Sequence, residues 1–148
     1  MGCDIHTHTE QQTSDGTYIN LDFSPFDWRG YGMYGFLADV RNYSNVPPIS
    51  EPRGIPDDVS SATYGDAEIW GGDAHSHSYL SIKELNEFDY DKPVEDCRVT
   101  IDGNGGCTCD RGEGQMTTYR ELLGSAFFYN IEKLNELKAD RVVFWFYN

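Results

Sequence analysis

The first 21 residues alternate between polar and apolar positions in the way that is typical of a β-hairpin. Residues 3–11 and 17–21 each follow the two-residue period of a strand, and residues 14–16 (SDG) between them have the composition of a tight turn. Near the other end of the chain, residues 141–146 (RVVFWF) are almost continuously apolar. This density predicts a central strand that is buried on both faces.

Three further segments have the signals of helices. Apolar residues recur at three- and four-residue spacing over 31–42 and, at greatest length, over 118–138, which opens with the capping sequence TYRE. The capping sequence SIKE at 81–84 predicts another, short helix. A further strand is expected over 97–101, before a glycine-rich turn at 102–106.

Residues 43–74 show neither period and are rich in Pro, Gly, Ser and Asp. A loop of this length in a compact domain is more often functional than idle. Hairpin-linked strands without repeated βαβ units argue for an α+β fold, in which two or three helices pack on a mainly antiparallel sheet. We therefore predict a single domain over 1–148 with a long functional loop at 43–74.

The composition narrows the classes of function. The chain has 25 acidic residues against 11 Lys and Arg, and its formal net charge of −14 argues against a partner such as long DNA or RNA. No apolar run approaches the roughly 18 residues of a membrane span, so no membrane association and a cytoplasmic location are expected. The four cysteines lack the spacing of a disulfide scaffold or a zinc knuckle, which predicts reduced thiols.

All four histidines lie in two doublets, each with one residue between the partners. His6 and His8 are on the first predicted strand, two and four residues after Asp4, whereas His75 and His77 follow the long loop. Because residues two apart on a strand share a face, Asp4, His6 and His8 should point the same way, and His75 and His77 should do so if their segment is extended. We expect the two doublets to meet in one site.

One chemistry for such a site uses a metal. The metal-ligand candidates are Asp4, His6 and His8, and a divalent ion such as Zn²⁺ or Mn²⁺ could be held by His6, His75, His77 and the Asp4 carboxylate. The ion would activate a water molecule for hydrolysis.

The other chemistry needs no metal. His75 and His77, with unperturbed pKa values of about 6.5, could act as general base and general acid on a phosphodiester. The neighbouring Ser76 and Ser78 would then bind the ligand as hydrogen-bond donors. The sequence leaves both alternatives open, and the catalytic candidates are His6, His75 and His77.

Three arginines are candidates for binding phosphate groups, because a guanidinium can donate two parallel hydrogen bonds to an anion. Arg29 lies next to Trp28, which could stack on a base, whereas Arg41 and Arg53 lie at a helix end and on the long loop. An equally good interpretation is that Arg41 and Arg53 pair with the many acidic residues nearby.

Several segments together resemble a family of small accessory proteins encoded by tailed phages and prophages. They are MGCDIH at 1–6, LADVRN at 37–42, PRGIPDDVS at 52–60, HSHSYL at 75–80 and VFWF at 143–146. The resemblance implies a role against host defence in the cytoplasm of an infected bacterium. Some proteins of this class bind or cleave nucleotide immune signals, such as cyclic dinucleotides or ADP-ribose derivatives, so the resemblance supports a function by analogy.

Three hypotheses follow. The first is a phosphodiesterase that cleaves a small cyclic nucleotide immune signal by histidine acid–base or metal-assisted chemistry. The second is a non-catalytic protein that sequesters such a nucleotide, and the third is an acidic inhibitor of a host defence enzyme. A small nucleotide is the expected partner in the first two, and the aromatic-rich composition is compatible with a homo-oligomer.

Overall fold

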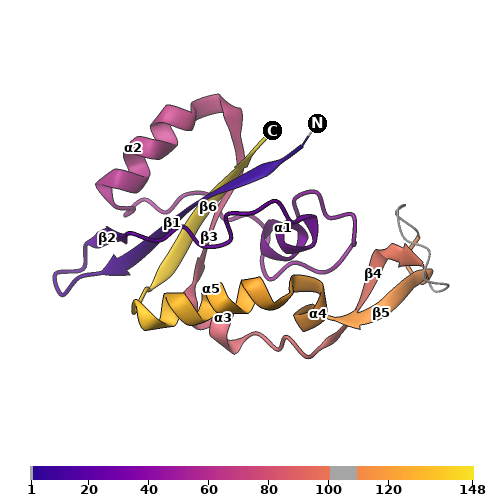
Figure 1. Ribbon diagram of the computed structural model, residues 1–148. Coiled ribbons are helices and arrows are strands. Elements are labelled where there is room, and N and C mark those ends of the chain that lie inside the picture. The colour runs from indigo at the N-terminus through magenta and orange to yellow at the C-terminus, as the bar shows by residue number, and fades with distance from the viewer. Residues whose placement is uncertain (1, 101–109) are drawn as a thin grey trace. The chain divides into compact units, whose positions relative to one another are not determined.

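The computed structural model describes residues 2–100 and 110–148, which form two compact units (Figure 1). The first unit comprises Met1–Arg29, Pro52–Glu87 and Phe128–Asn148, and the second comprises Gly30–Glu51 and Phe88–Phe127. Helices and antiparallel strands both occur, which confirms the predicted α+β class. Among the described residues, no helix combines the length and the apolar character that crossing a bilayer requires.

The first unit is built on a four-stranded antiparallel sheet in the order β2-β1-β6-β3. The strands are β1 (Asp4–Gln12), β2 (Tyr18–Leu21), β3 (Ala74–Ser81) and β6 (Arg141–Tyr147). The predicted opening hairpin and the predicted central strand are therefore confirmed. All residues of β6 except the last are buried, as the apolar run after Arg141 requires.

The register of β1 against β6 determines which side chains share a face. His6 lies opposite Trp145, and Thr7 lies opposite Phe144. Because successive residues of a strand point to opposite faces, one face of β1 carries its carboxylates and imidazoles, whereas the other carries Ile5 and two buried threonines. Strand β1 therefore presents its ionisable side chains on one face and buried side chains on the other.

Three helices belong wholly or mostly to this unit: α2 (Ser61–Trp70), α3 (Ile82–Glu87) and α5 (Ser125–Glu136), with a short 3₁₀ turn, η1 (Gly71–Asp73), after α2. Figure 1 shows α2 on one side of the sheet and α5 on the other. The predicted capping box at the start of α3 is confirmed, because Ser81 Oγ accepts from Glu84 N at 3.0 Å and Glu84 Oε1 accepts from Ser81 N at 3.1 Å.

Helix α2 lies within the segment that the sequence predicts as a loop, and that prediction is wrong for its residues. The helix begins after Ser60, whose Oγ accepts from Thr63 N at 3.1 Å. Thr63 is the one fully buried residue of α2. A helix without a buried apolar stripe gives no three- and four-residue period, so the pattern could not reveal it.

The second unit contains α1 (Tyr31–Ala38), α4 (Tyr119–Leu123) and an antiparallel hairpin of β4 (Pro93–Thr100) and β5 (Gly114–Thr118). Helix α1 ends before the predicted residue 42, because Asp39 adopts the left-handed conformation with φ of 58°. The core of the second unit is aromatic. The ring centroid of Phe36 lies 5.5 Å from that of Tyr119 and 5.9 Å from those of Tyr90 and Phe127.

The single helix that the sequence predicts over 118–138 is interrupted. Gly124, with φ of 80°, separates α4 from α5. This conformation is open to glycine and strained for other residues, so the break is encoded by one residue inside a helical pattern. The turn predicted at 102–106, residue 101 of the predicted strand, and Cys107 and Cys109 lie outside the described residues.

Candidate metal centre

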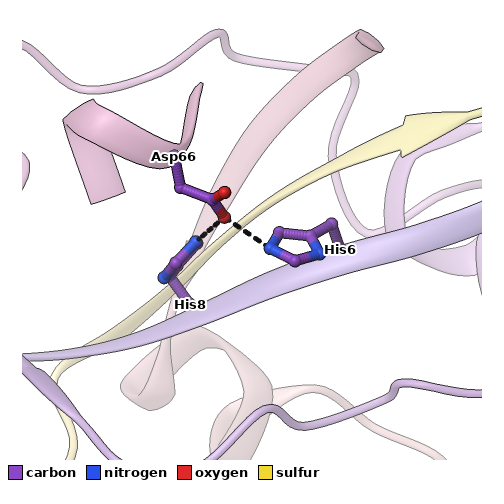
Figure 2. A group of neighbouring side chains, drawn as sticks. All are labelled: His6, His8 and Asp66. Carbon is purple, nitrogen blue, oxygen red and sulfur yellow. Dashed lines mark hydrogen bonds and ion pairs between the residues drawn. The ribbon is translucent and has the colours of Figure 1, made fainter. Parts of the chain in front are cut away.

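Two strand residues and one helix residue of the first unit bring their side chains to one point (Figure 2). His6 Nε2 lies 2.5 Å from Asp66 Oδ2, and His8 Nε2 lies 2.7 Å from the same oxygen. The ligand atoms that these side chains offer all lie within 4.8 Å of one another. The two-residue period of β1 turns both imidazoles toward α2, and Asp66 projects from α2 between them.

This set of atoms is suited to a divalent transition-metal ion. Two imidazole nitrogens and one carboxylate oxygen are a common ligand set of catalytic metal sites, in which further positions stay open for water or substrate. Ligand atoms around a tetrahedral zinc ion are about 3.3 Å apart. To admit the ion, Asp66 Oδ2 would therefore need to move away from each imidazole nitrogen by less than about 1 Å.

The centre lies on a buried aromatic ring. Trp145 is fully buried, and its ring centroid lies 5.3 Å from that of His6, 5.5 Å from that of His8 and 5.8 Å from that of His77. On the open side, the side chains of His6, His8 and Asp66 remain 35%, 16% and 26% exposed. The ligands are therefore supported from beneath by an apolar group and remain accessible from solvent.

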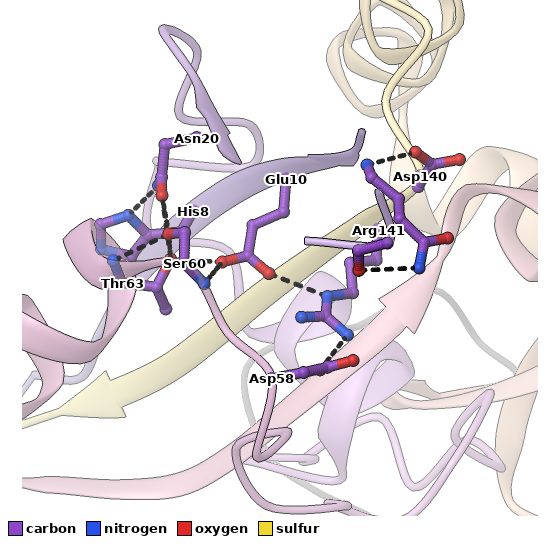
Figure 3. Close-up of polar contacts among 10 residues, drawn as sticks. His8, Glu10, Asn20, Asp58, Ser60, Thr63, Asp140 and Arg141 are labelled. Carbon is purple, nitrogen blue, oxygen red and sulfur yellow. Dashed lines mark hydrogen bonds and ion pairs between the residues drawn. The ribbon is translucent and has the colours of Figure 1, made fainter. Parts of the chain in front are cut away.

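A second layer of polar residues holds His8 (Figure 3). Asn20 lies opposite Glu10 in the β1–β2 ladder, and its Nδ2 is 2.9 Å from His8 Nδ1. Glu10 is fully buried and accepts from Ser60 N at 2.8 Å and from Thr63 Oγ1 at 2.7 Å. This carboxylate therefore joins β1 to the first turn of α2.

The opposite oxygen of Glu10 completes a buried ion pair. Arg141 Nε donates to Glu10 Oε1 at 2.8 Å, and the two side chains are 8% and 0% exposed. Arg141 Nη1 lies 2.9 Å from Asp58, and the guanidinium carbon is 3.5 Å from the ring centroid of Tyr18. The network that positions Asn20 is thus tied to the central strand of the sheet.

The two residues of the second histidine doublet do not share a face. Strand β3 shifts register between His75 and Ser78, and Ser76 has a positive φ of 56°. His75 pairs with Phe146 and its ring stacks 6.3 Å from that ring, whereas the His77 ring lies beside Trp145. Because Trp145 and Phe146 are adjacent on β6 and point to opposite faces, only His77 lies on the face of the metal centre.

Burial lowers the pKa of His77, and the nearby His75 lowers it further. His77 is therefore biased toward its neutral form. His75 Nε2 lies 3.1 Å from Asn148 Oδ1, and its Nδ1 lies 3.0 Å from Ser76 Oγ. The expected acid–base pair of His75 and His77 is not assembled in this structure.

The carboxylate of the centre is Asp66 and not the expected Asp4. Asp4 accepts from Arg29 Nε at 3.0 Å and from Arg29 Nη2 at 2.8 Å, and this pairing lowers the pKa of the Asp4 carboxyl. Sequence reasoning missed Asp66 because it lies on a helix that was not predicted. Ser60 followed by a long stretch without proline was the available signal for that helix.

Two of the phosphate-binding candidates, Arg41 and Arg53, belong to different units. Arg53 makes a double hydrogen bond to Glu84, at 2.9 and 2.6 Å, and also donates to Tyr79 O at 3.1 Å. Arg41 belongs to the second unit, where its guanidinium carbon lies 5.8 Å from the ring centroid of Tyr31. The interpretation that Arg53 pairs with a nearby acidic residue is thus the one that the structure shows.

The remaining ligand-binding candidates make contacts within the first unit. Ser78 is buried, and its Oγ accepts from Arg53 N at 3.1 Å. The ring of Trp28 lies 6.3 Å from that of Phe26. These contacts account for Trp28 and Ser78 as parts of the fold.

A pocket of about 340 Å³ has His8 among its lining residues. Its lining comes from the edge of β1, the end of β2 and the segment that follows: Thr7, His8, Thr9, Asn20, Leu21, Asp22, Phe23 and Ser24. This lining contains no Lys or Arg. The pocket is therefore suited to an uncharged polar group and not to a phosphate.

The sequence matches no protein-family model, and comparisons with curated proteins and with solved structures give no match. The interpretation of the centre therefore depends on its own geometry.

Proposed function

We propose that the protein is a metal-dependent phosphodiesterase that acts on a small cyclic nucleotide, with His6, His8 and Asp66 as the ligands of the ion. The observation that carries this proposal is the convergence of two imidazole nitrogens and a carboxylate oxygen at a solvent-accessible point. A divalent ion held there would polarise a phosphoryl oxygen and lower the pKa of a bound water to about 7.

Electrostatics support a role for an ion in binding the substrate. The chain carries a net charge of −14, and Arg29 and Arg53 make double hydrogen bonds to Asp4 and Glu84. A phosphodiester that approaches the centre therefore needs a positive charge, which a divalent ion supplies. A small substrate suits this field better than a long nucleic acid, which would meet repulsion along its whole length.

The surroundings of the centre match the remaining parts of a nucleotide. The polar pocket that shares His8 has room for a sugar or a base. Next to His6, the ring of Trp70 lies 5.5 Å from the imidazole and 4.3 Å from the ring of Tyr147. Aromatic rings of this kind stack on bases without regard to sequence.

His77 is the remaining imidazole on this face of the sheet, and its lowered pKa favours the neutral form that a general base needs at neutral pH. We assign it an acid–base role beside the ion. His75, which contacts Phe146 on the other face, serves as the matched control. Replacing His77 by Ala should lower turnover and leave metal affinity unchanged, whereas replacing His75 by Ala should change neither at a pH at which His77 is neutral in both proteins.

The decisive experiment is titration calorimetry of EDTA-treated protein with Zn²⁺ and with Mn²⁺. The wild type should bind one ion per chain, and Asp66→Asn should weaken binding by at least about tenfold. His75→Ala should bind like the wild type. An absence of binding, or equal losses in the Asp66 and His75 variants, would refute the assignment of the ligands.

Turnover is measured separately on bis(p-nitrophenyl) phosphate and on a panel of cyclic dinucleotides, with mass spectrometry to identify products. We expect cleavage with the ion present and none after EDTA. Recovery of intact nucleotide from a tight complex with the metal-loaded protein would instead support sequestration. Failure to bind any nucleotide, together with tight capture of a host defence enzyme, would support the inhibitor hypothesis.

A further inference from the structure

We propose that Asn20 controls the tautomer of His8, so that loading of the metal centre is accompanied by a half-turn rotation of the Asn20 amide. The inference rests on the proposed metal-dependent function and adds a positioning residue to it. Hydrogen bonds of Asn20 to His8 and Ser60, and of Ser60 to Glu10, join the centre to this buried carboxylate.

In the described arrangement, the ring hydrogen of His8 is on the nitrogen that faces Asp66. Asn20 Nδ2 is 2.9 Å from His8 Nδ1, and an amide nitrogen can only donate. His8 Nδ1 therefore accepts, and in a neutral imidazole the single hydrogen is then on Nε2. This hydrogen is donated to Asp66 Oδ2, which lies 2.7 Å away.

Binding of an ion requires the opposite tautomer. The Nε2 lone pair has to face the ion, so the hydrogen of the neutral ring has to be on Nδ1. The Asn20 amide nitrogen cannot accept that hydrogen. A rotation of the Asn20 amide by about 180° places Oδ1 opposite His8 Nδ1, where it accepts.

The groups on the other side of Asn20 can accommodate this rotation. At present Ser60 Oγ donates to Asn20 Oδ1, and the hydrogen of Thr63 Oγ1 goes to Glu10 Oε2. After rotation, Asn20 Nδ2 faces both hydroxyl oxygens and donates to them. Ser60 Oγ then donates to Thr63 Oγ1, which lies 3.0 Å away.

Both orientations therefore give His8 Nδ1, Ser60 Oγ and Thr63 Oγ1 a hydrogen-bond partner, and an amide is the side chain that allows this. A carboxylate at position 20 would accept from His8 Nδ1 but could never donate to it. An apolar isostere would leave Nδ1 without a partner in either state. Glu10 is held by Arg141 and by the first turn of α2. The residues around Asn20 therefore keep their positions while its amide rotates.

The test reads the His8 tautomer directly in the wild type. Protein labelled with ¹⁵N-histidine is studied by long-range ¹H–¹⁵N correlation, with and without one equivalent of Zn²⁺, and His8 is assigned from the spectrum of His8→Gln. We expect hydrogen on Nε2 in the metal-free protein and on Nδ1 in the Zn²⁺ complex. Observation of one and the same His8 tautomer in both states would overturn the inference.

Two substitutions of similar size provide an independent readout. Asn20→Leu should weaken Zn²⁺ binding by about 10- to 100-fold. Asn20→Asp should keep the affinity within a few-fold and hold hydrogen on His8 Nδ1 even without the ion. Asn86→Leu is the matched control, because Asn86 bonds to Asn135 in an exposed contact of the same unit.

The failures of the two proposals can be told apart. Tight Zn²⁺ binding by Asn20→Leu, equal to that of Asn86→Leu, would overturn the role of Asn20 and leave the metal function intact. An absence of Zn²⁺ binding by the wild type would overturn the metal function and this inference together. The tautomer measurement uses the wild type, so it does not depend on the folding of the position-20 variants.

Discussion

Replacing Glu10 by Gln is expected to be among the most damaging conservative changes in the first unit. Glu10 is fully buried and accepts from Arg141, from the Ser60 backbone and from Thr63. Gln has almost the same volume, so no cavity forms, but the negative charge is lost and an amide NH₂ group faces the guanidinium. Arg141 is then left with a buried charge and with Asp58, which is 63% exposed.

The expected cost follows from the burial of the pair. Removing one partner of a buried ion pair typically costs about 3–5 kcal/mol, because the other charge stays desolvated. The Arg141 and Glu10 side chains are 8% and 0% exposed, and Arg141 Nη2 is buried with no hydrogen-bond partner in the described part of the chain. For a chain of 148 residues, such a loss corresponds to a Tm lower by roughly 6–20 °C.

The assay is urea unfolding followed by far-UV circular dichroism, in EDTA so that no ion contributes to stability. Asp91→Asn is the matched control, since Asp91 and Arg120 pair at the surface with side chains 73% and 52% exposed. That change should lower the free energy of unfolding much less than Glu10→Gln does, because water screens an exposed pair. Equal and small losses of unfolding free energy in the two variants would refute the claim that the Glu10–Arg141 pair stabilises the fold more than an exposed pair does.

Three further predictions concern stability. Ser81→Ala removes the cap of α3 and should lower the free energy of unfolding by about 1 kcal/mol in the same assay. The hydrogen bond from Arg53 lowers the pKa of Glu84 to about 2, so the stabilisation by this carboxylate should be full above its ordinary pKa of about 4.5 and lost as the pH falls toward 2. The Tm difference between the wild type and Glu84→Gln should therefore shrink over that range, and a constant difference would contradict the reasoning. Gly124→Ala, at φ of 80°, should lower the free energy of unfolding by about 1 kcal/mol or more. Gly65→Ala, in open space within α2, should raise it by about 0.5–1 kcal/mol. Thermal unfolding of both variants checks that the two effects have opposite signs.

The parts of the fold that the sequence predicts correctly are those specified by local signals. The hairpin of β1 and β2 has a two-residue period and turn residues between its strands, and the α3 capping box consists of two side chains three residues apart. The break at Gly124 has a local cause as well, but one glycine inside a long helical pattern does not prove a break, because glycine is also tolerated within helices.

The sequence predicts the two histidine ligands of the candidate site but not its carboxylate. The strand period places His6 and His8 on one face, as expected, because β1 is regular. The same argument fails for His75 and His77, since the positive φ of Ser76 interrupts the alternation. Asp66 lies 60 residues from His6 in sequence, and no local pattern relates the two positions.

The way in which α2 is held has a consequence for the exchange of the ion. Its one fully buried residue is Thr63, and its contacts with the sheet include the hydrogen bonds of Ser60, Thr63 and Asp66 and the ring contacts of Trp70 with His6 and Tyr147. Segments held by few buried apolar groups open at a free energy well below that of global unfolding. Departure of α2 would withdraw one of the three ligands while β1 keeps the two imidazoles in place. We therefore expect the dissociation rate of the ion to follow the local opening of this helix, as amide hydrogen exchange would report it, and not the unfolding rate of the sheet.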